Sequence, residues 1–88
     1  MFRMWFKEWK DNRMIRDTVV EDSAYDTRTH KVFRALETAC NELDLAVPVW
    51  LDSNIREFKR HARTRFSQDS FMEEIDFDSL EAVIIEED

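Results

Sequence analysis

The complete absence of glycine from the 88 residues is the strongest constraint on what this chain can form. At the ordinary usage of about 7%, roughly six glycines would be expected. A loop that cradles phosphate needs glycine so that its backbone can approach the ligand. Nucleotide loops of the Walker, Rossmann and kinase types are therefore excluded. Tight turns must instead use Asn, Asp, Ser and the single proline, Pro48.

The length predicts a single domain over residues 1–88. A hydrophobic fraction of 43% and an aromatic fraction of 12% are typical of a folded chain with one modest core. One cysteine, Cys40, excludes an internal disulfide and a cysteine zinc cluster. The apolar start, Met1–Lys10, is interrupted by Arg3 and Lys7, and no segment approaches the roughly 20 apolar residues of a membrane span. We expect a cytoplasmic protein without a signal peptide or a membrane span.

Residues 2–20 read best as a β-hairpin. The first half is rich in aromatic residues, and the second half ends in the β-branched run Thr18–Val20. Between them, Asp11 and Asn12 can take the left-handed turn positions that glycine usually fills. A helix is the alternative for the first half, because its four aromatic residues also fit helical spacing.

Two helices are predicted after the hairpin. Asp26 or Thr27 can cap the first, and its apolar stripe ends before Pro48. Three capping residues in a row, Asp52, Ser53 and Asn54, precede the second helix, and Asn54 with Glu57 resembles a capping box. This helix should run to about His61 or Arg63. Residues 64–79 fit no single element, whereas Leu80–Ile85 reads as a strand within the sheet.

These elements predict an α+β domain of order ββααβ, in which the N-terminal hairpin and the C-terminal strand form a small antiparallel sheet of three or four strands with two helices. The expected core contains the apolar residues of these elements. They are Phe33, Leu36, Cys40, Leu43, Trp50, Ile55, Phe58, Val83 and Ile85.

The net charge of −7 is unevenly distributed. Residues 69–88 hold nine of the 20 acids and none of the 13 bases. Five bases cluster around the second helix: Arg56, Lys59, Arg60, Arg63 and Arg65. The first four of them would share one helical face. Such a row could bind the phosphates of a nucleic acid. The alternative is an ordinary solvated helix face, across which the acidic C-terminal segment would lie.

The aromatic residues Trp5, Phe6 and Trp9 form the second candidate site. Beside Arg3, Lys7 and Lys10 they could stack on bases, as in single-strand binding proteins. They could also be ordinary sheet packing. Neighbouring positions of a strand face opposite ways, so one apolar face would need cover, which a second copy or another protein would provide.

The sequence indicates no catalytic, metal or cofactor site. His30 and Cys40 lie on opposite sides of the first helix, and His61 follows a basic run that would repel a cation. The acids between residues 73 and 78 match no ligand spacing of a calcium loop. Cys40 is expected to be buried away from both histidines, and the serines lie in no elbow motif.

Several strings resemble a group of short, uncharacterised bacterial proteins of unknown function. The strings span most of the chain, and they are Lys10–Arg13, Asp17–Val19, Thr27–Phe33, Trp50–Phe58, Arg65–Phe66, Gln68–Asp69 and Ile84–Asp88. The resemblance implies a bacterial cytoplasmic protein, and it assigns no site residue.

The sequence therefore favours a non-catalytic protein-interaction module or homodimeric subunit that uses Trp5, Phe6 and Trp9. A nucleic-acid-binding module that uses the basic cluster is the alternative.

Overall fold

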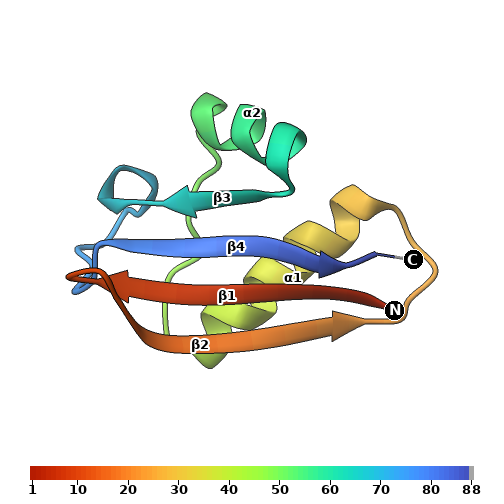
Figure 1. Cartoon of the computed structure of the whole chain (residues 1–88), viewed down its shortest axis with the longest axis horizontal. Helices are drawn as coiled ribbons and strands as arrows, with labels where there is room; N and C mark the ends of the chain where they lie inside the picture. The colour runs from red at the N-terminus through yellow and green to blue at the C-terminus, as the bar shows by residue number, and fades with distance from the viewer. Residues whose placement is uncertain (88) are drawn as a thin grey trace.

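The computed structural model of the chain describes residues 1–87, which form a four-stranded antiparallel sheet with two helices. The α+β class and the antiparallel sheet are confirmed. The strands are β1 (Phe2–Lys10), β2 (Arg13–Asp22), β3 (Arg63–Phe66) and β4 (Ser79–Glu86), and the sheet order is β2-β1-β4-β3. The helices are α1 (Arg28–Glu42) and α2 (Asp52–His61), with a short 3₁₀ turn at Gln68–Ser70 (Figure 1).

The element order differs from the predicted ββααβ because a further strand, β3, lies between α2 and β4. Helix α2 ends where Ala62 adopts a left-handed conformation, with φ 56° and ψ 28°. The chain then leaves as a strand in which Thr64 and Phe66 are buried while Arg63 and Arg65 are exposed. Four residues are too few for this alternation to be distinguished from the end of a helix by periodicity alone.

The N-terminal hairpin is confirmed, and the alternative helix is wrong. Asp11 and Asn12 have φ values of 51° and 64°, so both turn residues take the left-handed conformation that a two-residue hairpin loop requires. The cap of α1 is also confirmed, because the Thr27 side chain accepts a hydrogen bond from the His30 backbone N–H. Helix α2 starts earlier than predicted, so Asn54 lies inside it, and the Asn54 carbonyl oxygen accepts the backbone N–H of Leu51.

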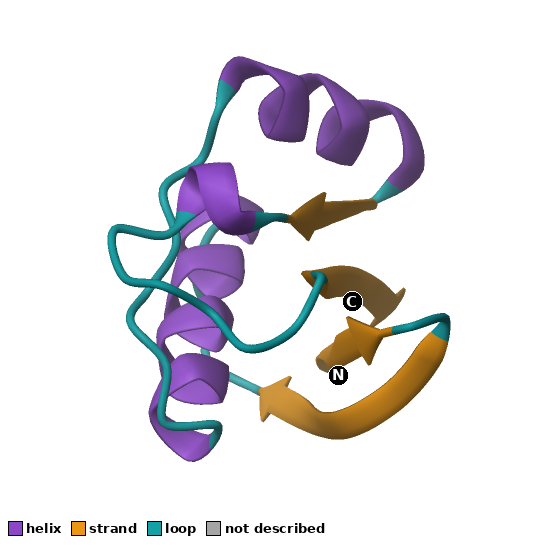
Figure 2. Ribbon diagram, turned by 90° about the vertical axis from the view of Figure 1, so that its left-hand side faces the viewer, coloured by secondary structure: helices purple, strands orange, loops and turns teal. Residues whose placement is uncertain are grey.

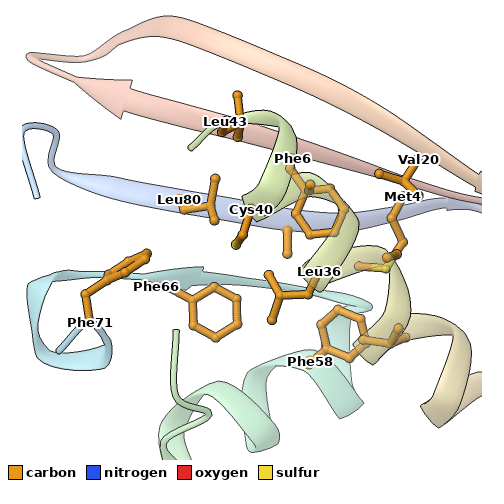
Figure 3. Packing of buried hydrophobic residues seen from close by; sticks show 14 of the residues in the cluster. Met4, Phe6, Val20, Leu36, Cys40, Leu43, Phe58, Phe66, Phe71 and Leu80 are labelled. Carbon is orange, nitrogen blue, oxygen red and sulfur yellow. The ribbon is translucent and has the colours of Figure 1, made fainter. Parts of the chain in front are cut away.

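The core lies between α1 and one face of the sheet. Figure 2 shows α1 along one side of the strands and α2 beyond the β3 edge. Strand β1 buries its even positions, from Phe2 to Glu8, and Phe6 and Leu80 point from the sheet toward α1 (Figure 3). Helix α1 contributes Leu36 and Cys40, as predicted.

Three residues predicted in the core are exposed instead. They are Phe33 at 51%, Ile55 at 40% and Ile85 at 48%. Phe33 and Ile55 lie on helices that do not close over them, and Ile85 lies at an irregularity in the β1–β4 register. Trp50 and Val83 are half-buried. The core also contains five aromatic residues that were not predicted in it: Phe2, Phe6, Phe66, Phe71 and Phe77.

Candidate functional site: the helix-free face of the sheet

The odd positions of β1 point to the face of the sheet that α1 does not cover. No helix among residues 1–87 lies over this face (Figure 2). Residues paired directly across neighbouring strands share a face, so the strand register identifies its other members. Trp5 pairs with Val19 on β2 and with Val83 on β4. We call this surface the helix-free face.

The helix-free face combines apolar and charged side chains. Its apolar members are Trp5, Trp9, Met14, Val19 and Val83. Its cations are Arg3, Lys7, Arg63 and Arg65, and its anions are Asp17, Glu21, Glu81 and Glu86. Cations and anions are equal in number, so the face has no net charge.

Both tryptophans on this face are held by carboxylates. The Trp5 indole N–H donates to an Oδ2 atom of Asp17 at 2.8 Å, and the Trp9 indole N–H donates to Oε1 of Glu81 at 2.9 Å. Each ring also has a cation over it. The Nζ atom of Lys7 lies 3.9 Å from the Trp5 ring centroid, and the Arg65 guanidinium lies 5.2 Å from that of Trp9. The two rings are therefore oriented before any partner arrives.

Glu81 is the anchor of this arrangement. Its side chain is only 8% exposed, yet it lies on the outer face of β4 under longer side chains. Besides the Trp9 indole, it has Lys7 Nζ at 3.7 Å and Arg65 Nη2 at 3.9 Å. A buried carboxylate needs such partners, because desolvation would otherwise disfavour its charge. No local sequence pattern indicates this role, since Glu81 belongs to a segment with nine acids that resembles a uniformly solvated surface.

The three aromatic residues of the predicted interface do not act together. Phe6 is fully buried in the core, so it contributes to no surface. Trp5 and Trp9 are half-buried on the helix-free face, where Lys7 lies between them on the same side of β1. Side chains alternate between the two faces of a strand, so Trp5 and Trp9 share one face and Phe6 lies on the other.

The five predicted nucleic-acid-binding residues occupy two surfaces. Arg56, Lys59 and Arg60 are exposed on α2, whereas Arg63 and Arg65 are exposed on β3. The single helical row of cations is therefore wrong, because the left-handed Ala62 ends the helix before Arg63. Arg65 lies beside Trp9 and Glu81 on the helix-free face. This contact depends on strand pairing, which no local sequence pattern indicates.

The acidic C-terminal segment does not neutralise α2 within the described residues. Glu81 pairs on the helix-free face, Glu86 pairs with Arg3, and Glu87 pairs with Arg28 at 2.9 Å. No carboxylate in residues 1–87 lies within ion-pair distance of Arg56, Lys59, Arg60 or Arg63.

Other candidate chemical groups stay separate. Burial, with a smaller effect of the nearby Glu8 charge, raises the pKa of the Cys40 thiol to about 11. His30 contacts Asp26 through its Nδ1 atom on an exposed surface. No group of three His, Cys, Asp or Glu side chains within residues 1–87 could hold a metal ion, and no helix in that range is long and apolar enough to cross a membrane.

No protein-family model, curated protein sequence or solved structure matches this chain.

Proposed function

We propose that this protein is a non-catalytic interaction module that pairs with a second copy of itself through the helix-free face. The observation that carries the proposal is the pair Trp5 and Trp9, each oriented by a carboxylate and a cation on a face that no described helix covers. Tryptophan and arginine are the residues most enriched at the energetic centres of protein interfaces. Rings that are already ordered lose little further side-chain entropy on binding.

The balance of charge favours a second copy as the partner. A two-fold interface brings the same surface patch together from both subunits, so it must be complementary to itself. Four cations and four anions on one face support that requirement, since the face carries no net charge that would repel an identical face. A surface for nucleic acid would carry an excess of cations instead.

The size of the face supports a dimer of modest affinity. A sheet of this kind is about 30 Å long and about 20 Å wide, or roughly 600 Å² in projection. A standard interface buries about 800 Å² per partner, and transient contacts bury less. We therefore expect the dimer to dissociate on dilution.

Analytical ultracentrifugation of three proteins tests the proposal. The wild type should sediment as a monomer–dimer equilibrium in the micromolar range. Val19→Arg places an unmatched cation on the face at a residue that is 46% exposed, so it should shift the chain to the monomer without unfolding it. Met72→Arg makes the same change at a residue that is 90% exposed and lies outside the sheet, and it should sediment like the wild type. A wild type that stays monomeric at 1 mM, or equal behaviour of the two variants, would refute the proposed dimer.

A nucleic-acid-binding role is the second candidate, supported by Arg56, Lys59 and Arg60 on α2 and by Arg63 on β3, none of which has a carboxylate of residues 1–87 within ion-pair distance. It expects anisotropy of labelled oligonucleotides to show affinity that falls steeply with salt, with a log–log slope of about −0.7 to −0.9 per phosphate contact. Arg60→Ala and Arg63→Ala should each reduce that slope by nearly one unit. Binding that does not depend on salt, or no binding, would exclude this role.

A further inference from the structure

The groove between α1 and α2 is a second feature, remote from the helix-free face. Its volume is about 280 Å³, and it is lined by Val32, Phe33, Trp50, Ile55 and Phe58 with Arg28, Thr29 and Lys59. This is close to the lower limit of ordinary ligand pockets, which begin near 300 Å³. The groove therefore suits a ligand of small size.

The apolar part of the groove is built on Trp50. Its ring makes edge contacts with Phe33 and Phe58, at centroid distances of 6.1 and 5.4 Å. A third edge contact, with Phe66 at 4.9 Å, ties the ring to β3. Phe33 and Ile55 remain 51% and 40% exposed on the two helices that border this ring. Apolar side chains thus face an unfilled space whose wall is held in place by aromatic packing.

The charged residues that line the groove are all cationic. Among residues 1–87, no carboxylate lies within ion-pair distance of Lys59, and the Arg28 guanidinium is paired through Nε with Glu87 at 2.9 Å. The Arg28 guanidinium also lies 5.6 Å from the Phe58 ring centroid, so it sits beside the apolar lining. Arg28 and Glu87 are each 46% exposed, so their ion pair is weak. Another carboxylate can therefore replace Glu87 beside Arg28.

We propose that this groove binds a small amphipathic carboxylate, whose apolar part contacts Phe33, Trp50 and Ile55 and whose anionic group meets Arg28 and Lys59 in place of Glu87. The charge complementarity selects an anion, and the volume selects a short alkyl chain or a single aromatic ring. The site lies away from the helix-free face, so it stands or falls independently of self-association.

Titration with octanoate, followed by ¹⁹F NMR of protein labelled with 5-fluorotryptophan, tests this site. The three tryptophans give three resonances, and Trp50→Phe assigns the one in the groove. Octanoate should shift the Trp50 resonance in a saturable manner, while Trp5 and Trp9 serve as internal controls on the other face. Octan-1-ol has the same chain without the charge, and it should bind more weakly.

Two variants separate the charge from the apolar wall. Lys59→Gln should weaken octanoate binding about two- to fivefold, the range of one exposed ion pair, and leave octan-1-ol unchanged. Phe33→Ser should weaken the binding of both ligands. Phe33 is 51% exposed, so this variant should stay folded, and the dispersion of the resonances checks that it does. Arg60→Gln, on the same helix but outside the groove, should change neither affinity. An unshifted Trp50 resonance at 10 mM octanoate, equal affinity for the two ligands, or an equal effect of Arg60→Gln and Lys59→Gln would overturn the proposal.

Discussion

The Trp9 indole N–H donates to the Glu81 carboxylate at 2.9 Å, and the two residues are 72 positions apart in the sequence. This contact fixes an aromatic ring on a sheet surface without covering it. It also explains why an acidic residue lies nearly buried beside two cations. The ordering of Trp9 is the structural basis of the proposed interface.

Removing the charge of Glu81 should destabilise the fold. Glu81→Gln keeps the size of the side chain but leaves Lys7 without its counter-ion, and Lys7 is only 18% exposed. We expect the free energy of unfolding to fall by about 1–2 kcal/mol, as for the loss of a charged hydrogen-bonding group. Urea denaturation followed by tryptophan fluorescence measures this change. Glu86→Gln, at 46% exposure, is the control and should change stability by less than about 0.5 kcal/mol. Equal losses in the two variants would contradict the anchoring role of Glu81.

Core substitutions should distinguish the two sides of α1. Leu36 is 2% exposed, so Leu36→Ala should lower the free energy of unfolding by about 2–5 kcal/mol through lost burial and the cavity left behind. Phe33 was expected in the core from the same helical stripe, but it is half-exposed. Phe33→Ala should therefore lower the free energy of unfolding by about 1 kcal/mol or less. Thermal unfolding followed by circular dichroism measures both. A larger effect at Phe33 than at Leu36 would mean that α1 is rotated relative to the sheet.

A positive φ value without glycine predicts a stabilising substitution. Ala62 ends α2 at φ 56°, a conformation that is unfavourable for any residue with a Cβ atom. Ala62→Gly should raise the free energy of unfolding by up to about 1 kcal/mol. Ala35→Gly makes the same change inside α1 and should lower the free energy of unfolding by about 1 kcal/mol. Urea denaturation of both variants gives the two signs, and a loss at both positions would show that Ala62 is not strained.

The free energy of unfolding should fall at low pH, as the carboxylates around Arg34 become protonated. The backbone N–H of Ala24, followed by Arg34, lowers the pKa of Asp22, and Arg34 is the largest cause of the lowered pKa of Asp26. Carboxyl groups whose pKa is lower in the folded state stabilise the fold above their unfolded pKa, near 3.8. That stabilisation is present at pH 5 and is lost as the pH falls through the folded pKa values.

The variant Arg34→Gln should therefore lose less stability than the wild type between pH 4 and pH 2. Urea denaturation at several pH values measures the slope. Arg56→Gln removes a cation that has no ion-pair partner among the described residues, and its slope should match that of the wild type. Parallel curves for Arg34→Gln and the wild type would contradict the assigned cause.

The thiol of Cys40 should be inert in the folded protein. Burial raises its pKa from 9.0 to about 11, so its thiolate fraction at pH 8 falls about a hundredfold, and the side chain is also inaccessible. Labelling by iodoacetamide should follow global unfolding, with rates that rise in proportion to the unfolded fraction in urea. Rapid labelling in buffer alone would show that α1 opens locally.

The sequence predicted the features that local chemistry determines. Asp11 and Asn12 identified the hairpin turn, because few residues besides glycine accept positive φ. Thr27 identified the start of α1, because its hydroxyl can accept a free N–H. Strand β3 was missed, since its alternation covers four residues only.

The site depended on contacts that the sequence does not encode locally. The alternation of the predicted strand separates Phe6 from Trp5 and Trp9, yet which of the two faces α1 covers required the folded structure. Arg65 reaches Trp9, and Glu81 reaches Lys7, only because β4 lies between β1 and β3. Such pairings follow from sheet order and register, which a single sequence leaves open.

The most direct test of self-association through the helix-free face is an isotope-filtered NOE experiment on a mixture of labelled and unlabelled protein at about 1 mM. The account predicts intermolecular NOEs between the ring protons of Trp5 or Trp9 and the methyl groups of Val19 or Val83. These NOEs should vanish in Val19→Arg and persist in Met72→Arg. Intermolecular NOEs confined to another surface, or none at this concentration, would contradict it.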